Sequence, residues 1–128
     1  MRLNALVVAI SIAVAAPVAH AQFAPDPLFG NDSHAKEVLD CHADYARRFA
    51  KALVKTQATP TEVATAAYAH CIGQFNEFVQ SVAATAKSSD NPKVFMDPEK
   101  YQAERVAELR EYSFAYTLDA YLTSTTAC

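Results

Sequence analysis

The chain has 128 residues, of which 52% are hydrophobic, and it contains two glycines, no tryptophan and a formal net charge of −3. A chain of this size fits one domain with a modest core. Its surplus of acidic residues disfavours nucleic acid or an anionic membrane surface as the main partner, and abundant alanine beside so few glycines predicts an all-α fold.

Residues 1–21 have the layout of a secretory signal peptide. Arg2 supplies the positive charge, and the apolar stretch from Ala5 to Val18 is shorter than the ~20 residues that a bilayer span needs. Ala19-His20-Ala21 then places small residues at both positions that cleavage requires. We therefore expect an exported protein, periplasmic or extracellular and without a stable membrane anchor.

After cleavage the mature chain would begin at Gln22. Residues 22–30 contain two prolines and a glycine, so they predict an extended leader. Residues 31–128 then form a single helical domain. Without Arg2, the mature chain has ten basic and fourteen acidic residues, so its net charge remains negative.

The first helix is expected to begin near Asn31, Asp32 or Ser33, all of which are good N-cap residues, and to end at about Thr56. Its apolar side is formed by residues at helical spacing, with charged residues opposite, so the helix is amphipathic. That apolar side contains Val38, His42, Tyr45, Phe49 and Leu53.

The second helix has the clearest start signal. Thr59 is an N-cap, Pro60 occupies the first helical position and Glu62 stands three residues after the cap. The helix is expected to run to about Lys87. Gly73 lowers the stability of the helix by up to ~1 kcal/mol relative to alanine. A close helix crossing would explain why a glycine stands at this position. The inward side holds Ala64, Ala67, Tyr68, Cys71, Phe75, Phe78, Val79 and Val82.

The third helix is expected to start after Asp97, an N-cap followed by Pro98 and Glu99. Three helices joined by short links predict an up-down-up three-helix bundle. The core side of the third helix is expected to contain Val106, Leu109, Tyr112, Tyr116 and Ala120.

Two cysteine–histidine pairs are compatible with either a metal site or a disulfide. Cys41 precedes His42, whereas His70 precedes Cys71. Successive helical residues are rotated by about 100°, so His70 lies on the polar side of its helix when Cys71 faces inward. His70 therefore cannot complete a metal site with four ligands. A disulfide between Cys41 and Cys71 suits an exported chain and would contribute ~3 kcal/mol. Two unpaired core thiols, or a metal site, are the alternatives.

The third cysteine, Cys128, has no partner in this scheme. An odd cysteine in an exported chain predicts either a free thiol or an intermolecular disulfide. The second outcome would give a covalent homodimer or a mixed disulfide.

Catalytic and metal-binding signals are weak. His70 and Glu77 are two helical turns apart and could share a ligand, although a solvated polar face is the favoured explanation. His42 is expected to be a hydrogen-bonded, partly buried residue. HExxH, Ser-His-Asp and glycine-rich phosphate motifs are absent from the sequence, and the glutamates of the third helix alternate with lysine and arginine as on a solvated face. We expect no cofactor and no catalytic residue.

The end of the third helix carries a second apolar strip formed by Phe114, Leu118, Tyr121 and Leu122. A helix that is apolar on two sides is packed on both or exposes a patch. Either the leader covers the strip, through Phe23, Leu28 and Phe29, or the strip binds a partner protein or a second copy of the chain.

The sequence therefore favours a small exported helical protein that binds another protein without catalysis, as an inhibitor, immunity protein, chaperone or effector does. The alternative is a periplasmic metal-handling protein that uses His, Cys and Glu side chains. The third reading is an enzyme of an unrecognised type.

Overall fold

A computed structural model describes Phe29, residues 31–52 and residues 58–126 of the chain. All regular secondary structure in these ranges is helical: α1 Ser33–Ala50, α2 Pro60–His70, α3 Ile72–Ser88, α4 Pro92–Phe95 and α5 Pro98–Thr126. The all-α prediction is confirmed for this part of the chain. The expected signal peptide, the start at Gln22 and Cys128 lie outside the described residues.

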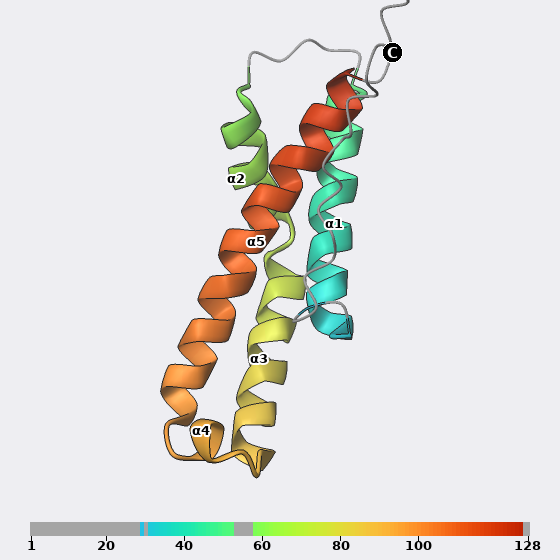
Figure 1. The fold of residues 1–128 in the computed structure, drawn as a ribbon. Coiled ribbons are helices and arrows are strands. Elements are labelled where there is room, and N and C mark those ends of the chain that lie inside the picture. Colours follow the sequence, from blue (N-terminus) through green and yellow to red (C-terminus); the bar gives the residue numbers. More distant parts are fainter. Residues whose placement is uncertain (1–28, 30, 53–57, 127–128) are drawn as a thin grey trace, which may run out of the picture.

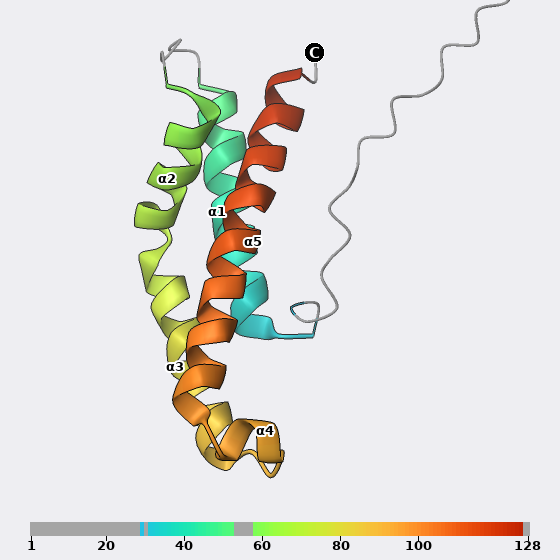
Figure 2. The same cartoon turned by 60° about the vertical axis from the view of Figure 1, so that its left-hand side comes forward.

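The helices lie along one long axis in alternating directions. α1 runs one way, α2 and α3 return beside it, and the short α4 leads at the far end into α5 (Figure 1). Turning the molecule shows that α5 runs back along nearly the whole length (Figure 2). It contacts α1, α2, α3 and α4, that is, every other helix of the described residues. None of the helices in the described ranges is both long and apolar enough to cross a membrane.

The three predicted helix starts are confirmed by their capping hydrogen bonds. The Asp32 carboxylate accepts two backbone N–H groups in the first turn of α1, at 3.0 and 3.1 Å. Thr59 and Glu62 form a reciprocal capping box at the start of α2, and these hydrogen bonds lower the pKa of the Glu62 carboxyl. Asp97 accepts a backbone N–H in the first turn of α5 at 3.1 Å. Each cap satisfies amides that a helix end leaves without partners.

Two helix boundaries differ from the sequence prediction. α1 ends at Ala50 and not at about Thr56, because the N–H of Ala52 turns back to the carbonyl of Phe49 and tightens the last turn. The long second helix is two helices, since the backbone at Cys71 has φ −98° and ψ 17° and separates α2 from α3. The four-residue α4 was not predicted at all.

Gly73 does not mark a close helix crossing. A Cβ atom built at this position would meet nothing within 4 Å, so the expected close approach is wrong. The glycine instead lies two residues after the bend at Cys71. Its low helix propensity opposes a bend less than the propensity of a strong helix former would.

The core divides into two clusters along the axis. The larger cluster joins α1, α3 and α5 with one residue of the leader, and the smaller one joins α1, α2 and α5. Their buried members are Phe29, Ala35, Val38, Phe75, Phe78, Val82 and Leu109 in the first, and Ala43, Ala46, Val63 and Ala120 in the second.

The leader contributes to the larger cluster through Phe29. This ring is 2% exposed and its centroid lies 6.4 Å from that of Phe78 and 5.6 Å from that of Tyr112. The Arg105 guanidinium covers it at 4.7 Å. Phe29 therefore packs on α3 and the first half of α5. Phe23 and Leu28, the other leader residues expected to cover the strip, lie outside the described residues.

The buried side of α5 is displaced from the predicted one. Ser113 and Thr117 are buried at 1% and 0% exposure, whereas Tyr112 and Tyr116 are half-buried beside them. The centre of the buried face is therefore formed by small side chains, which let α5 lie close to α1. The sequence prediction chose the larger aromatic neighbours, because hydrophobic periodicity gives weight to size and apolarity.

Candidate recognition site

The predicted disulfide between Cys41 and Cys71 is present, with the two Cα atoms 6.0 Å apart. It ties the middle of α1 to the junction of α2 and α3, and Cys71 is fully buried. Because both sulfurs are oxidised, neither is available as a thiolate ligand. The bridge therefore fixes the bend between α2 and α3 against α1.

His42, next to the disulfide, is a buried neutral histidine. It is 1% exposed, and its Nδ1 lies 3.0 Å from the hydroxyl oxygen of Thr117. That hydroxyl donates its own proton to the carbonyl of Ser113 at 2.5 Å, so Nδ1 of His42 must be the donor and Nε2 carries the lone pair. Nε2 has no hydrogen-bond partner within the described residues. Burial lowers the pKa of His42 to about 4. The prediction of a hydrogen-bonded histidine is confirmed, whereas the side chain is fully buried and not partly buried as expected.

A hollow with a volume of about 440 Å³ opens between α2 and α5, and the His42 ring of α1 is among its lining groups. Its size falls within the range of ~300–1,000 Å³ typical of ligand sites. Small side chains on the two facing helices leave this space. The remaining lining residues are Ala64, Thr65, Tyr68, Ala107, Arg110, Glu111, Ser113 and Phe114.

Arg110 and Tyr68 form one wall of the hollow. The guanidinium donates a hydrogen bond to the Tyr68 hydroxyl at 3.3 Å and lies over the rings of Tyr68 and Phe75, at 5.6 and 5.7 Å. Such a cation over aromatic faces is an attractive contact that holds these side chains in place. Phe114, at 38% exposure, supplies an apolar edge that faces solvent. The arrangement is suited to taking up an apolar group rather than to activating a nucleophile.

The predicted partner strip on α5 adjoins this hollow. Phe114 lines it, Leu118 is half-buried, and Leu122 is 49% exposed. Tyr121 packs on the smaller core cluster, with its ring centroid 6.4 Å from that of Phe49. The more exposed members of the strip are thus Phe114 and Leu122.

The other residues that line the hollow were not recognised as a site from the sequence. Ala64 and Tyr68 were assigned to the core side of α2, and Ala107 was not singled out. In the sequence, the hollow is indicated only by small residues on α2 and α5. That these residues face each other can be recognised only when the rotation of α2 relative to α5 is known.

The structure does not group His70 with Glu77. His70 is exposed and its ring centroid lies 5.0 Å from that of Tyr45. Within the described ranges, the group of potential metal ligands that contains Glu77 also contains His34 and Glu37, and it does not include His70.

Comparison of the chain with protein-family models, with curated protein sequences and with solved structures finds no match. The inferences about function below therefore rest on the geometry of this chain.

Proposed function

We propose that this chain is an exported, non-catalytic protein that binds another protein by taking an apolar side chain of that partner into the hollow between α2 and α5. The observation that carries the proposal is the hollow itself, with its apolar walls and the partly exposed ring of Phe114 at its edge. Aromatic side chains are enriched among the residues that dominate binding energy at protein interfaces.

The surface around the hollow favours a protein over a small molecule. Phe114, Leu118 and Leu122 follow one another at four-residue spacing on α5, so apolar surface continues from the hollow towards the end of the helix. A small molecule would leave this surface in contact with water. An amphipathic helix laid along α5 would cover it and insert one side chain into the hollow, which is a common mode of peptide recognition.

The mature chain in this proposal is an up-down-up three-helix bundle whose second rod is the bent pair α2 and α3. It begins at Gln22 after removal of the signal peptide, and it keeps its disulfide because exported compartments permit disulfides. The intact mass of the protein recovered from the envelope and the medium tests this part, since cleavage after Ala21 predicts a chain that starts at Gln22.

Affinity capture with matched variants tests the binding proposal. Disulfide-bonded wild-type protein, Phe114→Glu and Met96→Glu are immobilised and exposed to the native envelope fraction. Met96 is 77% exposed and directly follows α4, which lies at the end of the molecule where α5 begins, so its variant adds the same charge away from the hollow. We expect one partner retained by the wild type and Met96→Glu, and its affinity, remeasured with purified partner, to fall at least about tenfold for Phe114→Glu.

Equal affinity of all three proteins for the partner would contradict the proposal. So would an apolar small molecule released from the wild type on denaturation, because the hollow would then be a carrier site. If the captured protein is a second copy of the chain, the partner is the homodimer that the strip near Cys128 also predicts.

A further inference from the structure

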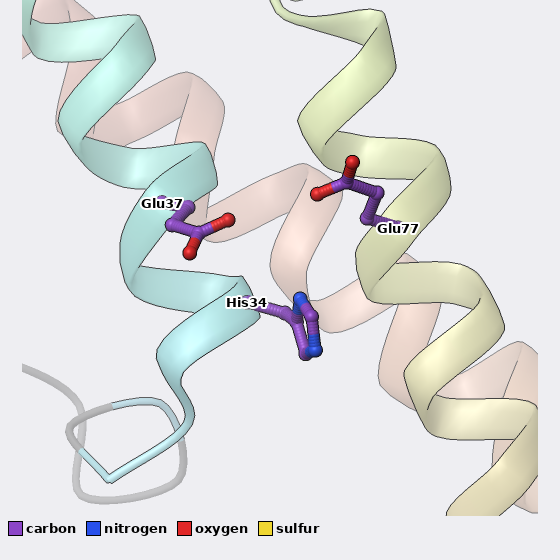
Figure 3. A group of neighbouring side chains, drawn as sticks. All are labelled: His34, Glu37 and Glu77. Atoms are coloured by element: carbon purple, nitrogen blue, oxygen red, sulfur yellow. The ribbon is translucent and has the colours of Figure 1, made fainter.

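A second group of functional side chains lies away from the hollow, where α1 faces α3. His34 and Glu37 project from the first two turns of α1, and Glu77 projects from α3 (Figure 3). One ligand atom from each of the three side chains can be chosen such that all lie within 4.8 Å of one another. Figure 3 shows a ring nitrogen of His34 directed to the gap between the two carboxylates.

The disulfide explains why these residues meet. Cys41 and Cys71 fix the register between the antiparallel α1 and α3. Moving seven residues back from Cys41 reaches His34, and moving six residues forward from Cys71 reaches Glu77. Because both helices rise by ~1.5 Å per residue, the two positions lie at nearly the same level.

The carboxylates have no cationic partner within the described residues. Neither Glu37 nor Glu77 takes part in a salt bridge there, and the neighbouring Lys36 is paired with Asp40 at 2.8 Å. The Nδ1 atom of His34 is buried and has no hydrogen-bond partner in the same ranges. Two negative groups beside an unpartnered imidazole nitrogen form an arrangement that a bound cation would stabilise.

We propose that His34, Glu37 and Glu77 bind a divalent transition-metal ion such as Zn²⁺ and thereby join α1 to α3. An imidazole with two carboxylates is a nitrogen–oxygen ligand set that suits Zn²⁺ and its first-row neighbours, whereas Ca²⁺ and Mg²⁺ prefer oxygen ligands alone. The ion offsets the charge of the two carboxylates. Water fills the coordination positions that the three side chains leave, since both glutamates are exposed.

Zinc titration of the chelator-stripped, disulfide-bonded protein tests the site. Calorimetry should show saturation at one ion per chain. Glu77→Gln and His34→Ala should each weaken binding at least about tenfold, because loss of a direct ligand costs no less than loss of an outer-shell partner. Asp90→Asn is the matched control for Glu77→Gln: it removes one exposed negative charge beyond the end of α3 and should leave the affinity unchanged.

The position of the ion is read from the histidine rings. In protein labelled with ¹⁵N at the histidine rings, zinc should shift the ring nitrogens of His34 and leave those of His70 and His42 in place. Shifts confined to His70, equal affinity of Glu77→Gln and wild type, or equal weakening by Asp90→Asn would overturn the proposal. The test does not depend on the hollow between α2 and α5, because binding of zinc is measured in the absence of any partner protein.

Discussion

The buried His42 makes the stability of the protein depend on pH. Its pKa is about 4 in the folded protein because burial disfavours the charged form, against about 6.5 in an unfolded chain. Between these two values the unfolded state binds a proton that the folded state does not. The contribution of His42 to stability is therefore complete above pH 6.5 and is lost as the pH falls towards 4.

The size of this effect follows from the two pKa values. Relative to pH 7, linkage predicts that the folded state loses about 2 kcal/mol at pH 5 and about 3 kcal/mol at pH 4 through this one group. For a small domain this is a large part of the total free energy of unfolding, which is commonly 5–15 kcal/mol. His42 is thus expected to dominate the weakening of the protein in mild acid.

Urea unfolding at pH 7 and at pH 5, for the wild type and His42→Asn, measures the effect. Asparagine keeps an N–H donor for the Thr117 hydroxyl but does not titrate. It leaves unfilled volume and lowers stability at both pH values, so the compared quantity is the difference between pH 7 and pH 5 in each protein. We expect that difference to be about 2 kcal/mol larger in the wild type. An equal difference in both proteins, or a His42 ring that titrates near pH 6.5 by NMR, would refute the reasoning.

Two further substitutions test the fold. Replacing Cys41 and Cys71 by alanine should lower the free energy of unfolding by about 3–4 kcal/mol, since the bridge closes a loop with a sequence separation of 30. Calorimetry should then show a melting temperature lower by on the order of 20 °C. An unchanged melting temperature would show that the bridge does not stabilise the fold. Gly73→Ala should raise the free energy of unfolding by up to about 1 kcal/mol, because the added methyl meets no neighbour and alanine favours the helix. A loss of stability in urea unfolding would mean that the bend at Cys71 needs the glycine.

The local features of the fold could be predicted from the sequence. The caps at Asp32, Thr59 and Asp97 depend on residue types a few positions apart, and all three are in place. The pairing of Cys41 with Cys71 also followed, because an exported chain permits disulfides and His70, on the polar side of its helix, does not complete a metal site. These predictions needed no knowledge of how the helices are rotated against one another.

Features that depend on helix rotation could not be predicted in the same way. Ser113 and Thr117 are buried because α5 lies close to α1, a relation that a hydrophobicity pattern does not contain. The bend at Cys71 lies at the residue that the disulfide holds against α1, whereas helix propensity alone favours a continuous helix. The group of His34, Glu37 and Glu77 joins two helices, so sequence spacing singled out Glu77 but paired it with His70.

The central claim is that the hollow between α2 and α5 recognises another protein. Site-specific photo-crosslinking in producing cells tests it most directly, with a benzophenone amino acid placed at position 114 or, for comparison, at the highly exposed position 96. The account predicts one discrete adduct with a partner protein from position 114 and none from position 96. Adducts from position 96 alone, or from neither position, would contradict it.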